Sequence, residues 1–548
     1  MVRIVQQLAV LVLSSTSLLG HASVVDAGAT SEAGQNIAII GAGAAGSSAA
    51  YHLRRFADEE GIPINITIFE SREHAGGRAR TVNAYDDPLQ PVEQGASIFI
   101  RVNTILYDAT QEFGLPLVGD DNGVEETLVI WDGENFRYEQ KDSSSKWWSY
   151  VKLFWKYGMA PLKTKKLVDS TINRFLEMYS EPHFPFKSLT QTAIDLDLVK
   201  LTGITGGQFL QESGIGLSFA QDIVQAATRV NYATNLAHIH GLETMVSMAP
   251  DGAMQIAGGN WQIFANMVKA STASFLSGST VTSLELEKSD IADSSSSKYI
   301  ISTKKTGASD AGEPYANAFD KVIVATPWQY GEIQTSADLI EPAIDEIPYV
   351  RLHVTLFTSP FKLSPRFFNL PPGSEAPTTV LTTLHPDSKA EPGSDAAGKA
   401  GFFSVSTLRA VTNPKTKQRE YLYKVFSPQV LDPFFLSKLL GVEVPDTFTG
   451  QATNEDVEPI SWYYPHVFNS YPIEFPRVTF QDPILGNGLY YTSGIESFIS
   501  TMETSALMGK NVARIIVNEL AGKDDASEKQ SITDEASSTL APGSQDEL

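Results

Sequence analysis

Apolar and polar positions near the start of the chain follow a strand, helix, strand pattern. Residues 37–40 are continuously apolar, and a glycine-rich stretch separates them from a helical segment that runs to Arg55. A second apolar run, residues 64–69, ends at Glu70. Two buried strands joined by a helix within about 35 residues are typical of a parallel βαβ unit.

Further along, the pattern predicts aromatic helices over residues 146–180 and a surface loop over the Pro-, Gly-, Ser- and Asp-rich residues 384–400. Residues 523–548 are rich in Ser, Asp and Glu without aromatic side chains, which predicts a disordered tail. Three more strands are predicted over residues 281–287, 299–304 and 319–325.

The first 22 residues have the pattern of a secretory signal. Arg3 precedes a short apolar stretch, and small residues near Ala22 offer a cleavage site. The chain ends in Gln545-Asp-Glu-Leu548, which is close to an endoplasmic reticulum retention signal. We therefore expect the secretory pathway, with the endoplasmic reticulum lumen, a lysosome or vacuole, or secretion as destinations. The sequon Asn65-Ile66-Thr67 falls in a predicted buried strand, so we expect it to be unused.

The amino-acid composition argues against several classes of function. The formal net charge of −23 disfavours nucleic-acid binding. The absence of cysteine excludes disulfides, thiol catalysis and Cys-metal sites. His238 and His240 have strand spacing suited to one face, but two histidines make a poor metal site, so we expect no metal.

The motif Gly41-Ala-Gly43-Ala-Ala45-Gly46, which directly follows the first strand, is the first indication of a binding site. Gly41 permits a tight turn, Gly43 permits close approach of a pyrophosphate, and Gly46 permits packing of helix on strand. The phosphates would lie at the helix amino terminus, where free N–H groups favour negative charge. Glu70, placed 24 residues after Gly46, would bind the adenosine ribose and repel an NADP 2′-phosphate.

Other residues extend this site toward FAD. Gly77 and Arg78 form a second small loop whose cation would contact the pyrophosphate. Gly95 and Ser97 would approach the flavin ring, and no second strand-flanked glycine motif offers a nicotinamide domain. Electrons would then pass from substrate to O2, which favours an oxidase. Four further cofactor-binding residues are predicted downstream, Val281, Thr326, Gly494 and Glu496.

Residues 146–166 form a basic aromatic segment in an otherwise acidic chain. Trp148, Val151, Trp155 and Met159 recur near helical spacing among several lysines. Such a stripe is usually part of a core, and this is the interpretation that we favour. The alternative is peripheral contact with an anionic membrane.

The chain resembles the prenylcysteine oxidase (prenylcysteine lyase) family of secretory flavoproteins, in a fungal-type form. Some of the shared motifs are common to amine-oxidase-like flavoproteins, whereas Arg229-Val-Asn-Tyr232, Lys424-Val-Phe-Ser427 and Tyr464-Pro-His466 are specific to this family. The common motifs are the glycine motif at residues 39–43 and Gly76-Gly77-Arg78, and the resemblance further includes residues 69–70, 258–260, 324–327 and 489–496.

The resemblance implies an FAD-dependent oxidase that cleaves the thioether of S-farnesyl- or S-geranylgeranyl-L-cysteine. Oxygen and water would be consumed, with cysteine, a prenyl aldehyde and H2O2 as products. The carbon that loses hydride is allylic and bonded to sulfur, so both neighbours stabilise the developing cation. The protein would supply orientation, an apolar groove and controlled water.

No settled catalytic residue comes with the resemblance. Tyr464 and His466 are candidates for the polar end of the substrate pocket, followed by Asn231 and Tyr232. Ile100 stands where animal members, as we align them, have a histidine, so a proton-handling role there would be lost or moved.

Two classes of alternative remain. The shared flavin motifs also permit an amine oxidase or an isoprenoid desaturase. A non-catalytic prenyl-binding escort protein, related to the GDP-dissociation-inhibitor family, is the other alternative.

The predicted fold is α/β, with an FAD-binding Rossmann-like domain of the amine-oxidase and GDI-like type and an inserted mixed α+β substrate domain. The FAD-binding domain is expected to be discontinuous, over residues 35–100, 240–330 and 480–522. The substrate domain is expected over residues 101–239 and 331–479.

Overall fold

The structure is a computed structural model. It describes residues 34–118, 123–141, 153–249, 252–287, 297–336, 339–340, 343–448, 457–486 and 488–523. The predicted signal segment and nearly all of the predicted tail lie outside the described residues. Within the described residues, none of the helices combines the length and apolar character needed to cross a membrane.

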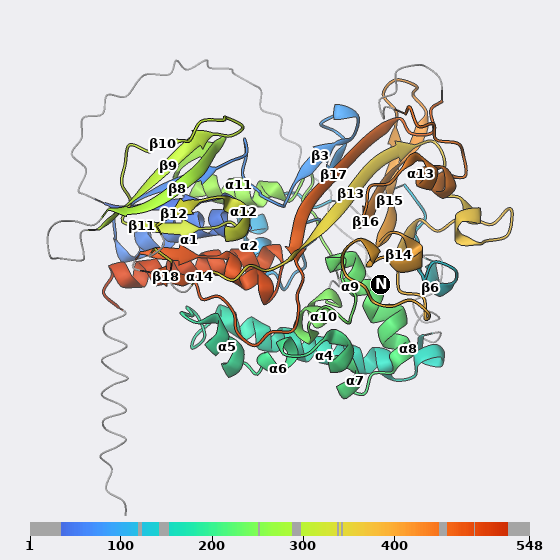
Figure 1. Cartoon of the computed structure of the whole chain (residues 1–548), viewed down its shortest axis with the longest axis horizontal. Helices are drawn as coiled ribbons and strands as arrows, with labels where there is room; N and C mark the ends of the chain where they lie inside the picture. Colours follow the sequence, from blue (N-terminus) through green and yellow to red (C-terminus); the bar gives the residue numbers. More distant parts are fainter. Residues whose placement is uncertain are drawn as a thin grey trace, which may run out of the picture.

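A six-stranded sheet forms the centre of the nucleotide-binding part, on the left of Figure 1. Its central strands are parallel, and only the edge pair β18–β19 is antiparallel. In spatial order the strands are β18 (Ile484–Gly486), β19 (Leu489–Tyr491), β11 (Lys321–Val324), β1 (Gln35–Ile40), β2 (Ile64–Glu70) and β7 (Ser274–Ser277). Apolar residues dominate the central strands because helices and a second sheet cover both faces.

Two long helices pack tightly beside this sheet, α1 (Ala44–Glu60) and α14 (Met502–Leu520) (Figure 1). A Cβ atom on Gly509 of α14 would lie 2.1 Å from the carbonyl oxygen of Ala45 in α1. The small residues therefore allow the two backbones to approach closely. Helices α2 (Thr104–Glu112) and α11 (Trp261–Ala270) complete this layer.

Smaller sheets flank the central one. The four-stranded sheet has the order β10 (Glu313–Pro314), β9 (Lys298–Lys305), β8 (Ser279–Glu287) and β12 (Gln334–Thr335). It shares a hydrophobic cluster with the outer face of the six-stranded sheet. Strands β3 (Thr81–Asn83) and β4 (Pro91–Glu93) form a separate pair, and the short helix α12 (Trp328–Gly331) follows β11.

A seven-stranded sheet forms the other half of the molecule, on the right of Figure 1. The chain enters this sheet first through β5 and β6 and returns to it after α12 for the remaining strands. It then goes back to the six-stranded sheet for β18 and β19. Its spatial order is β17 (Trp462–Pro472), β13 (Tyr349–Ser359), β16 (Arg419–Ser427), β15 (Ser404–Thr412), β14 (Thr379–Thr382), β5 (Thr127–Trp131) and β6 (Phe136–Lys141).

A layer of helices lies below both halves in Figure 1, and α13 (Pro433–Leu440) lies beside the seven-stranded sheet. The layer contains α4 (Ala160–Leu176), α5 (Leu189–Asp195), α6 (Val199–Thr202), α7 (Gly206–Glu212), α8 (Leu217–Phe219), α9 (Gln225–Tyr232) and α10 (Gly241–Ser247).

Arg229 connects helix α9 to the loop between β14 and β15 through hydrogen bonds. Its guanidinium is fully buried and donates to the hydroxyl of Thr382 and to the carbonyls of Ala396 and Ala397, among other acceptors. Burial lowers the pKa of Arg229 to about 9. The loop was predicted to lie on the surface, and this is only partly correct, because Ala396, Ala397 and Ala400 are buried where they cover Arg229.

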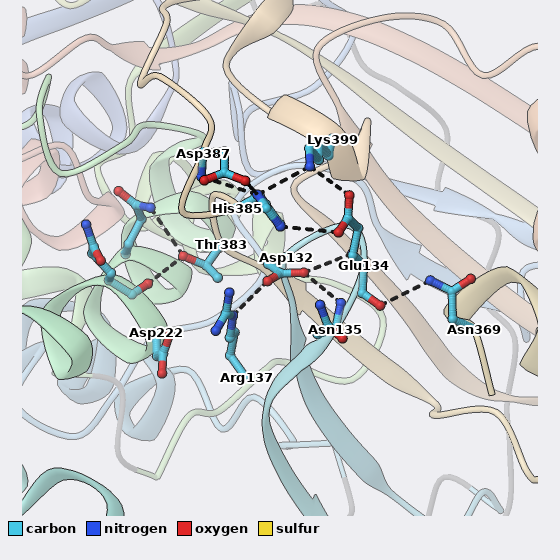
Figure 2. Close-up of polar contacts among 12 residues, drawn as sticks. Asp132, Glu134, Asn135, Arg137, Asp222, Asn369, Thr383, His385, Asp387 and Lys399 are labelled. Atoms are coloured by element: carbon cyan, nitrogen blue, oxygen red, sulfur yellow. Dashed lines mark hydrogen bonds and ion pairs between the residues drawn. The ribbon is translucent and has the colours of Figure 1, made fainter.

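Polar contacts hold the same loop to the β5–β6 hairpin (Figure 2). The Lys399 ammonium lies 2.7 Å from one oxygen of Glu134, and His385 Nε2 lies 3.3 Å from the other. Asp132, at the end of β5, accepts the backbone N–H of Asn135 and the side chain of Arg137. The loop is therefore held from both sides.

One local prediction is wrong. The described part of the basic aromatic stripe is not core, because Trp155 is 84% exposed and Met159 is 52% exposed. Trp148 and Val151 lie outside the described residues. Asn65 lies in β2 as predicted, but its side chain is exposed and donates to the Asn36 side chain.

Candidate functional site

A cavity of about 1340 Å³ lies between the nucleotide-binding part and the seven-stranded sheet. Most of the residues predicted from the sequence to bind cofactor or substrate line this cavity, although they come from distant segments. They are Gly41, Gly43, Ala45, Glu70, Gly77, Arg78, Gly95, Ser97, Val281, Thr326 and Glu496, together with Asn231 and Tyr232.

The glycine loop forms one end of the cavity. Gly41 has a φ of +100°, which a side chain would strain, and no side chain caps the amino end of α1. A Cβ atom on Gly43 would have the Cα of Gly77, at 3.8 Å, as its nearest neighbour among the described residues. The two glycines thus leave a cradle beside a helix amino terminus, which fits a diphosphate.

Gly46 does not line the cavity and has a packing function. A Cβ atom at this position would lie 1.9 Å from the carbonyl oxygen of Gly41 and 3.1 Å from the Cβ of Ala325. Any side chain would therefore push helix α1 away from the sheet.

The Glu70 carboxylate lies at the carboxyl end of β2 and is buried. One oxygen accepts the backbone N–H of Ala42 at 2.7 Å, and the other accepts that of Arg72 at 2.8 Å. These two bonds fix the carboxylate against the glycine loop. The second oxygen also accepts the Ser71 hydroxyl at 3.3 Å, so it is the first oxygen that retains acceptor capacity for a ribose hydroxyl.

Arg78 and Glu496 form an ion pair across the cavity wall. The guanidinium donates to the Glu496 carboxylate at 2.6 Å and to the carbonyl of Ser470 at 2.8 Å. The Tyr349 hydroxyl donates to the same oxygen of Glu496 at 3.0 Å. Burial disfavours the Arg78 charge, but the charge of Glu496, the nearby Tyr349 and the hydrogen bond to Glu496 together outweigh burial and raise the pKa of Arg78.

Three predicted residues lie elsewhere. Gly494 packs against Gln481, whose carbonyl oxygen would be 2.5 Å from an added Cβ. Tyr464 and His466 are on β17 but are not among the residues that line the cavity, and the Tyr464 hydroxyl accepts a hydrogen bond from Arg80. Their placement does not support the polar end of the substrate pocket predicted for them.

Asn231 and Tyr232 do line the cavity, at the carboxyl end of α9. The Asn231 amide donates to the carbonyls of Ala227 and Ser247, which fixes its orientation. The Tyr232 ring packs edge-to-face on Tyr471. Burial, followed by the nearby Glu243, raises the pKa of Tyr232.

Behind Tyr232 lies a fully buried group of acidic residues and one histidine. Nε2 of His240 is 3.2 Å from a Glu474 oxygen, and Nδ1 of His240 accepts the backbone N–H of Glu243. Burial, together with the charge of Glu474, raises the pKa of Glu243 to about 8. Burial lowers the pKa of His240 to about 4. Among the described residues, no group of three or more His, Asp or Glu could hold a metal ion.

Apolar side chains form the opposite part of the cavity. Phe175 and Leu176 of α4 contribute from the helical layer, and Leu352, Phe426 and Phe468 contribute from the seven-stranded sheet. The cavity therefore joins a polar, glycine-lined end to an apolar end.

Lys424 is a cavity residue that was not among the sequence-based candidates. It lies on β16 and is only 8% exposed, and its ammonium donates to the Glu93 carbonyl and the Ser97 hydroxyl. The sequence offered one indication of this residue, a single lysine among the apolar residues of the strand, because charged side chains are seldom buried without a partner.

Comparison with known proteins agrees with this geometry. The profile of an NAD(P)-binding Rossmann-like domain matches residues 39–113. Among solved structures, cyclohexylamine oxidase from Brevibacterium oxydans IH-35A superposes with a TM-score of 0.53 over 89% of this chain and 100% of its own, at 17% identity. A putrescine oxidase mutant superposes with a TM-score of 0.53 over 88% of this chain and 99% of its own, at 14% identity. These likenesses confirm the predicted fold.

Sequence relatives are more specific. Farnesylcysteine lyase from Arabidopsis thaliana is 27% identical over 90% of both chains. Prenylcysteine oxidase 1 from Bos taurus is 29% identical over 87% of both chains, and its Homo sapiens counterpart is 27% identical over 89% of this chain and 90% of its own. The profile described as prenylcysteine lyase matches residues 140–529. The chain therefore belongs to the prenylcysteine lyase family.

Proposed function

We propose that this protein is an FAD-dependent oxidase that cleaves S-prenyl-L-cysteine, with O2 and water as co-substrates and cysteine, a prenyl aldehyde and H2O2 as products. The observation that carries the proposal is the continuous cavity, which joins a diphosphate-sized glycine cradle to an apolar chamber. Membership of the prenylcysteine lyase family supports the same substrate class.

The residues at the polar end fit FAD. Gly41, Gly43 and Gly77 leave room for the diphosphate, Glu70 would bind the ribose, and Arg78 would place a cation beside the phosphates. When bound, FAD accepts the hydride that the substrate loses and passes the electrons to O2.

The chain's own residues supply orientation and solvent control. Phe175, Leu352 and Phe468 offer the prenyl chain an apolar surface, so the substrate's polar cysteine end is directed to the rest of the cavity. Asn231 and Tyr232 are polar groups in this wall, suited to position the water that attacks the oxidised carbon. A low-water site also prolongs the lifetime of the oxidised thioether until that attack.

Peroxide release from S-farnesyl-L-cysteine tests the proposal. Purified protein should be yellow and should form H2O2, cysteine and farnesal in equal amounts from this substrate. Putrescine and cyclohexylamine, as amine controls, should give no peroxide. Oxidation of the amines alone would establish an amine oxidase, and a colourless protein that binds farnesylcysteine without turnover would establish an escort protein.

We also propose that the exposed segment after residue 153 contacts membranes that hold the lipid-like substrate. Phe154, Trp155, Met159 and Leu162 are all more than half exposed, and the exposed Lys163 and Lys166 follow them in the chain. Exposed aromatic residues with neighbouring cations suit an anionic bilayer surface. Flotation with phosphatidylserine vesicles should fall strongly when Trp155, Met159 and Leu162 are changed to Ser. Unchanged flotation would exclude this contact.

The sequence at the two ends supports a location in the secretory pathway, and Gln545-Asp-Glu-Leu548 supports retention in the endoplasmic reticulum. Microscopy of an internally tagged chain tests this. Removing the last four residues should move the protein to a lysosome or vacuole or into the medium, and an unchanged reticular pattern would argue against retention by this sequence.

A further inference from the structure

Lys424 carries a buried positive charge at the cavity wall without a carboxylate partner. Its ammonium donates to the Glu93 carbonyl at 2.8 Å and to the Ser97 hydroxyl at 2.7 Å, both uncharged acceptors. Among the described residues, no carboxylate lies within ion-pair distance of it. The Glu93 carboxylate is instead hydrogen-bonded to the Asn260 backbone and the Thr81 hydroxyl.

The other neighbours of Lys424 are apolar or neutral, but the Glu93 carboxylate is close enough to raise the pKa of Lys424 against the larger effect of burial. Leu356 of β13 and Ser406 of β15 are its cross-strand neighbours, and its ammonium lies 4.9 Å from the centre of the Phe426 ring. Burial lowers the pKa of Lys424 to about 8, so the group remains mostly protonated at neutral pH. Burying a cation lowers the stability of the fold. Buried charges of this kind are common at functional sites.

The two acceptors of Lys424 identify which end of the cavity it faces. Glu93 and Ser97 bound the short segment that includes Gly95, and a Cβ atom on Gly95 would lie 1.9 Å from the Arg78 carbonyl oxygen. This segment therefore continues the wall that starts at Gly77 and Arg78. A cofactor whose diphosphate lay at Gly43 and Gly77 would meet this wall next, so the residues of the wall are those that would hold its redox-active ring.

We infer that Lys424 is a catalytic residue of the oxidative half-reaction, in which its ammonium stabilises negative charge on dioxygen as dioxygen is reduced. The inference rests on the proposed function, which supplies both O2 and the reduced cofactor. Dioxygen takes two electrons and one proton from the reduced cofactor and a second proton from water, and leaves as H2O2. The first electron produces superoxide, which is negatively charged. A nearby cation that is shielded from water stabilises this charge far more than a cation in water could. Lys424 keeps its own proton throughout.

The test separates the two half-reactions with FAD-loaded protein. Enzyme reduced with dithionite under argon is mixed with oxygenated buffer, and reoxidation is followed by flavin absorbance. Lys424→Met and Lys424→Gln, which remove the charge, should reoxidise at least about tenfold more slowly than the parent chain. Lys424→Arg should retain most of the rate, and Lys399→Met, which removes a lysine outside the cavity wall, should match the parent chain.

A second readout needs no turnover. Sulfite is an anion that adds to oxidised flavin, and its affinity rises with positive charge beside the ring. Both neutral variants should bind sulfite at least about tenfold more weakly, while Lys424→Arg should not.

Three results would overturn the inference. Reoxidation and sulfite affinity of the neutral variants could equal those of the parent chain. The loss could be confined to the dissociation constant for farnesylcysteine in anaerobic reduction, which would make Lys424 a partner of the substrate carboxylate. Both neutral variants could fail to retain FAD although folded by circular dichroism, which would make it a cofactor-binding residue. Failure of the proposed function itself would appear separately, as absence of anaerobic reduction by farnesylcysteine in the parent chain.

Discussion

The Arg78 guanidinium lies 2.6 Å from the Glu496 carboxylate, although 418 positions separate the two residues in the chain. The pair joins the loop that follows β2 to the turn that precedes α14. Glu496 is 4% exposed, so each charge depends on the other to remain in the cavity wall.

Removing Arg78 should weaken FAD binding more than removing the charge of Glu496. Arg78→Met deletes the cation beside the diphosphate and leaves a buried carboxylate near it, whereas Glu496→Gln retains the cation. We expect at least a tenfold rise in the FAD dissociation constant for Arg78→Met, about 1.4 kcal/mol or more, and a smaller change for Glu496→Gln. Quenching of flavin fluorescence on titration of apoprotein measures both. The reverse order would contradict a phosphate-directed role for Arg78.

Gly43 and Gly46 should fail in different ways when changed to Ala. A methyl group on Gly43 has no close protein neighbour but fills the cradle, so the apoprotein should keep its melting temperature while FAD affinity falls. A methyl group on Gly46 meets the Gly41 carbonyl oxygen at 1.9 Å, so the apoprotein itself should lose stability. Thermal melts of the two apoproteins separate these outcomes, and equal melting temperatures would refute the assignment.

Arg229→Met should destabilise the fold by about 3 kcal/mol or more. The variant leaves the carbonyls of Ala396 and Ala397 and the hydroxyl of Thr382 without their donor in a buried site. Urea unfolding of the apoprotein measures the change. Lys399→Met, on the same loop, removes a partly exposed ion pair with Glu134 and a contact with Nδ1 of His385, and as the matched control it should cost less than about 1 kcal/mol. Similar losses in both variants would mean that Arg229 has no special structural role.

Stability should fall as the pH rises from 6.5 to 8, and Glu243 should cause part of the fall. Folded Glu243 has a pKa near 8, whereas an unfolded glutamate has released its proton well below pH 6.5. The folded state therefore binds more protons in this window, which makes the slope of stability against pH negative. Folded His240 titrates below the window, whereas an unfolded histidine, with a pKa near 6.5, still releases protons at the lower end of the window and opposes the fall there. Melting temperatures of Glu243→Gln should decline less than those of the parent chain, and parallel declines would contradict this account.

The nucleotide end of the site could be predicted because its residues are close in sequence and follow one strand. The order of strand, Gly41, Gly43, Gly46 and Glu70 is a local pattern with a known geometric reason. The structure places Gly46 against the Gly41 carbonyl oxygen, which is the packing function expected for it.

The substrate end was harder to predict because it depends on sheet register. Tyr464 and His466 share one face of β17 with Phe468, as alternation along a strand requires, and their rings form a continuous row. Phe468 lines the cavity and the other two residues do not. Sequence indicates which face a residue occupies, but how far the cavity extends along the strand is set by what packs against it.

Lys424 and the basic aromatic segment show the same limit. The strand containing Lys424 faces the cavity only because β13 and β15 flank it in the observed register. For Trp155, helical spacing is compatible with either core or surface, and the more frequent interpretation was wrong here. In both cases the missing information was tertiary.

The close contact between Gly509 in α14 and Ala45 in α1 has a consequence for biosynthesis. The first helix and glycine cradle leave the ribosome early, but the helix that covers them is translated last, together with Glu496. A nascent chain therefore exposes the apolar side of α1 for most of its synthesis and completes its cofactor site only at the end. Maturation of this protein should depend on chaperones that protect an unfinished amino-terminal unit, with FAD loaded after release.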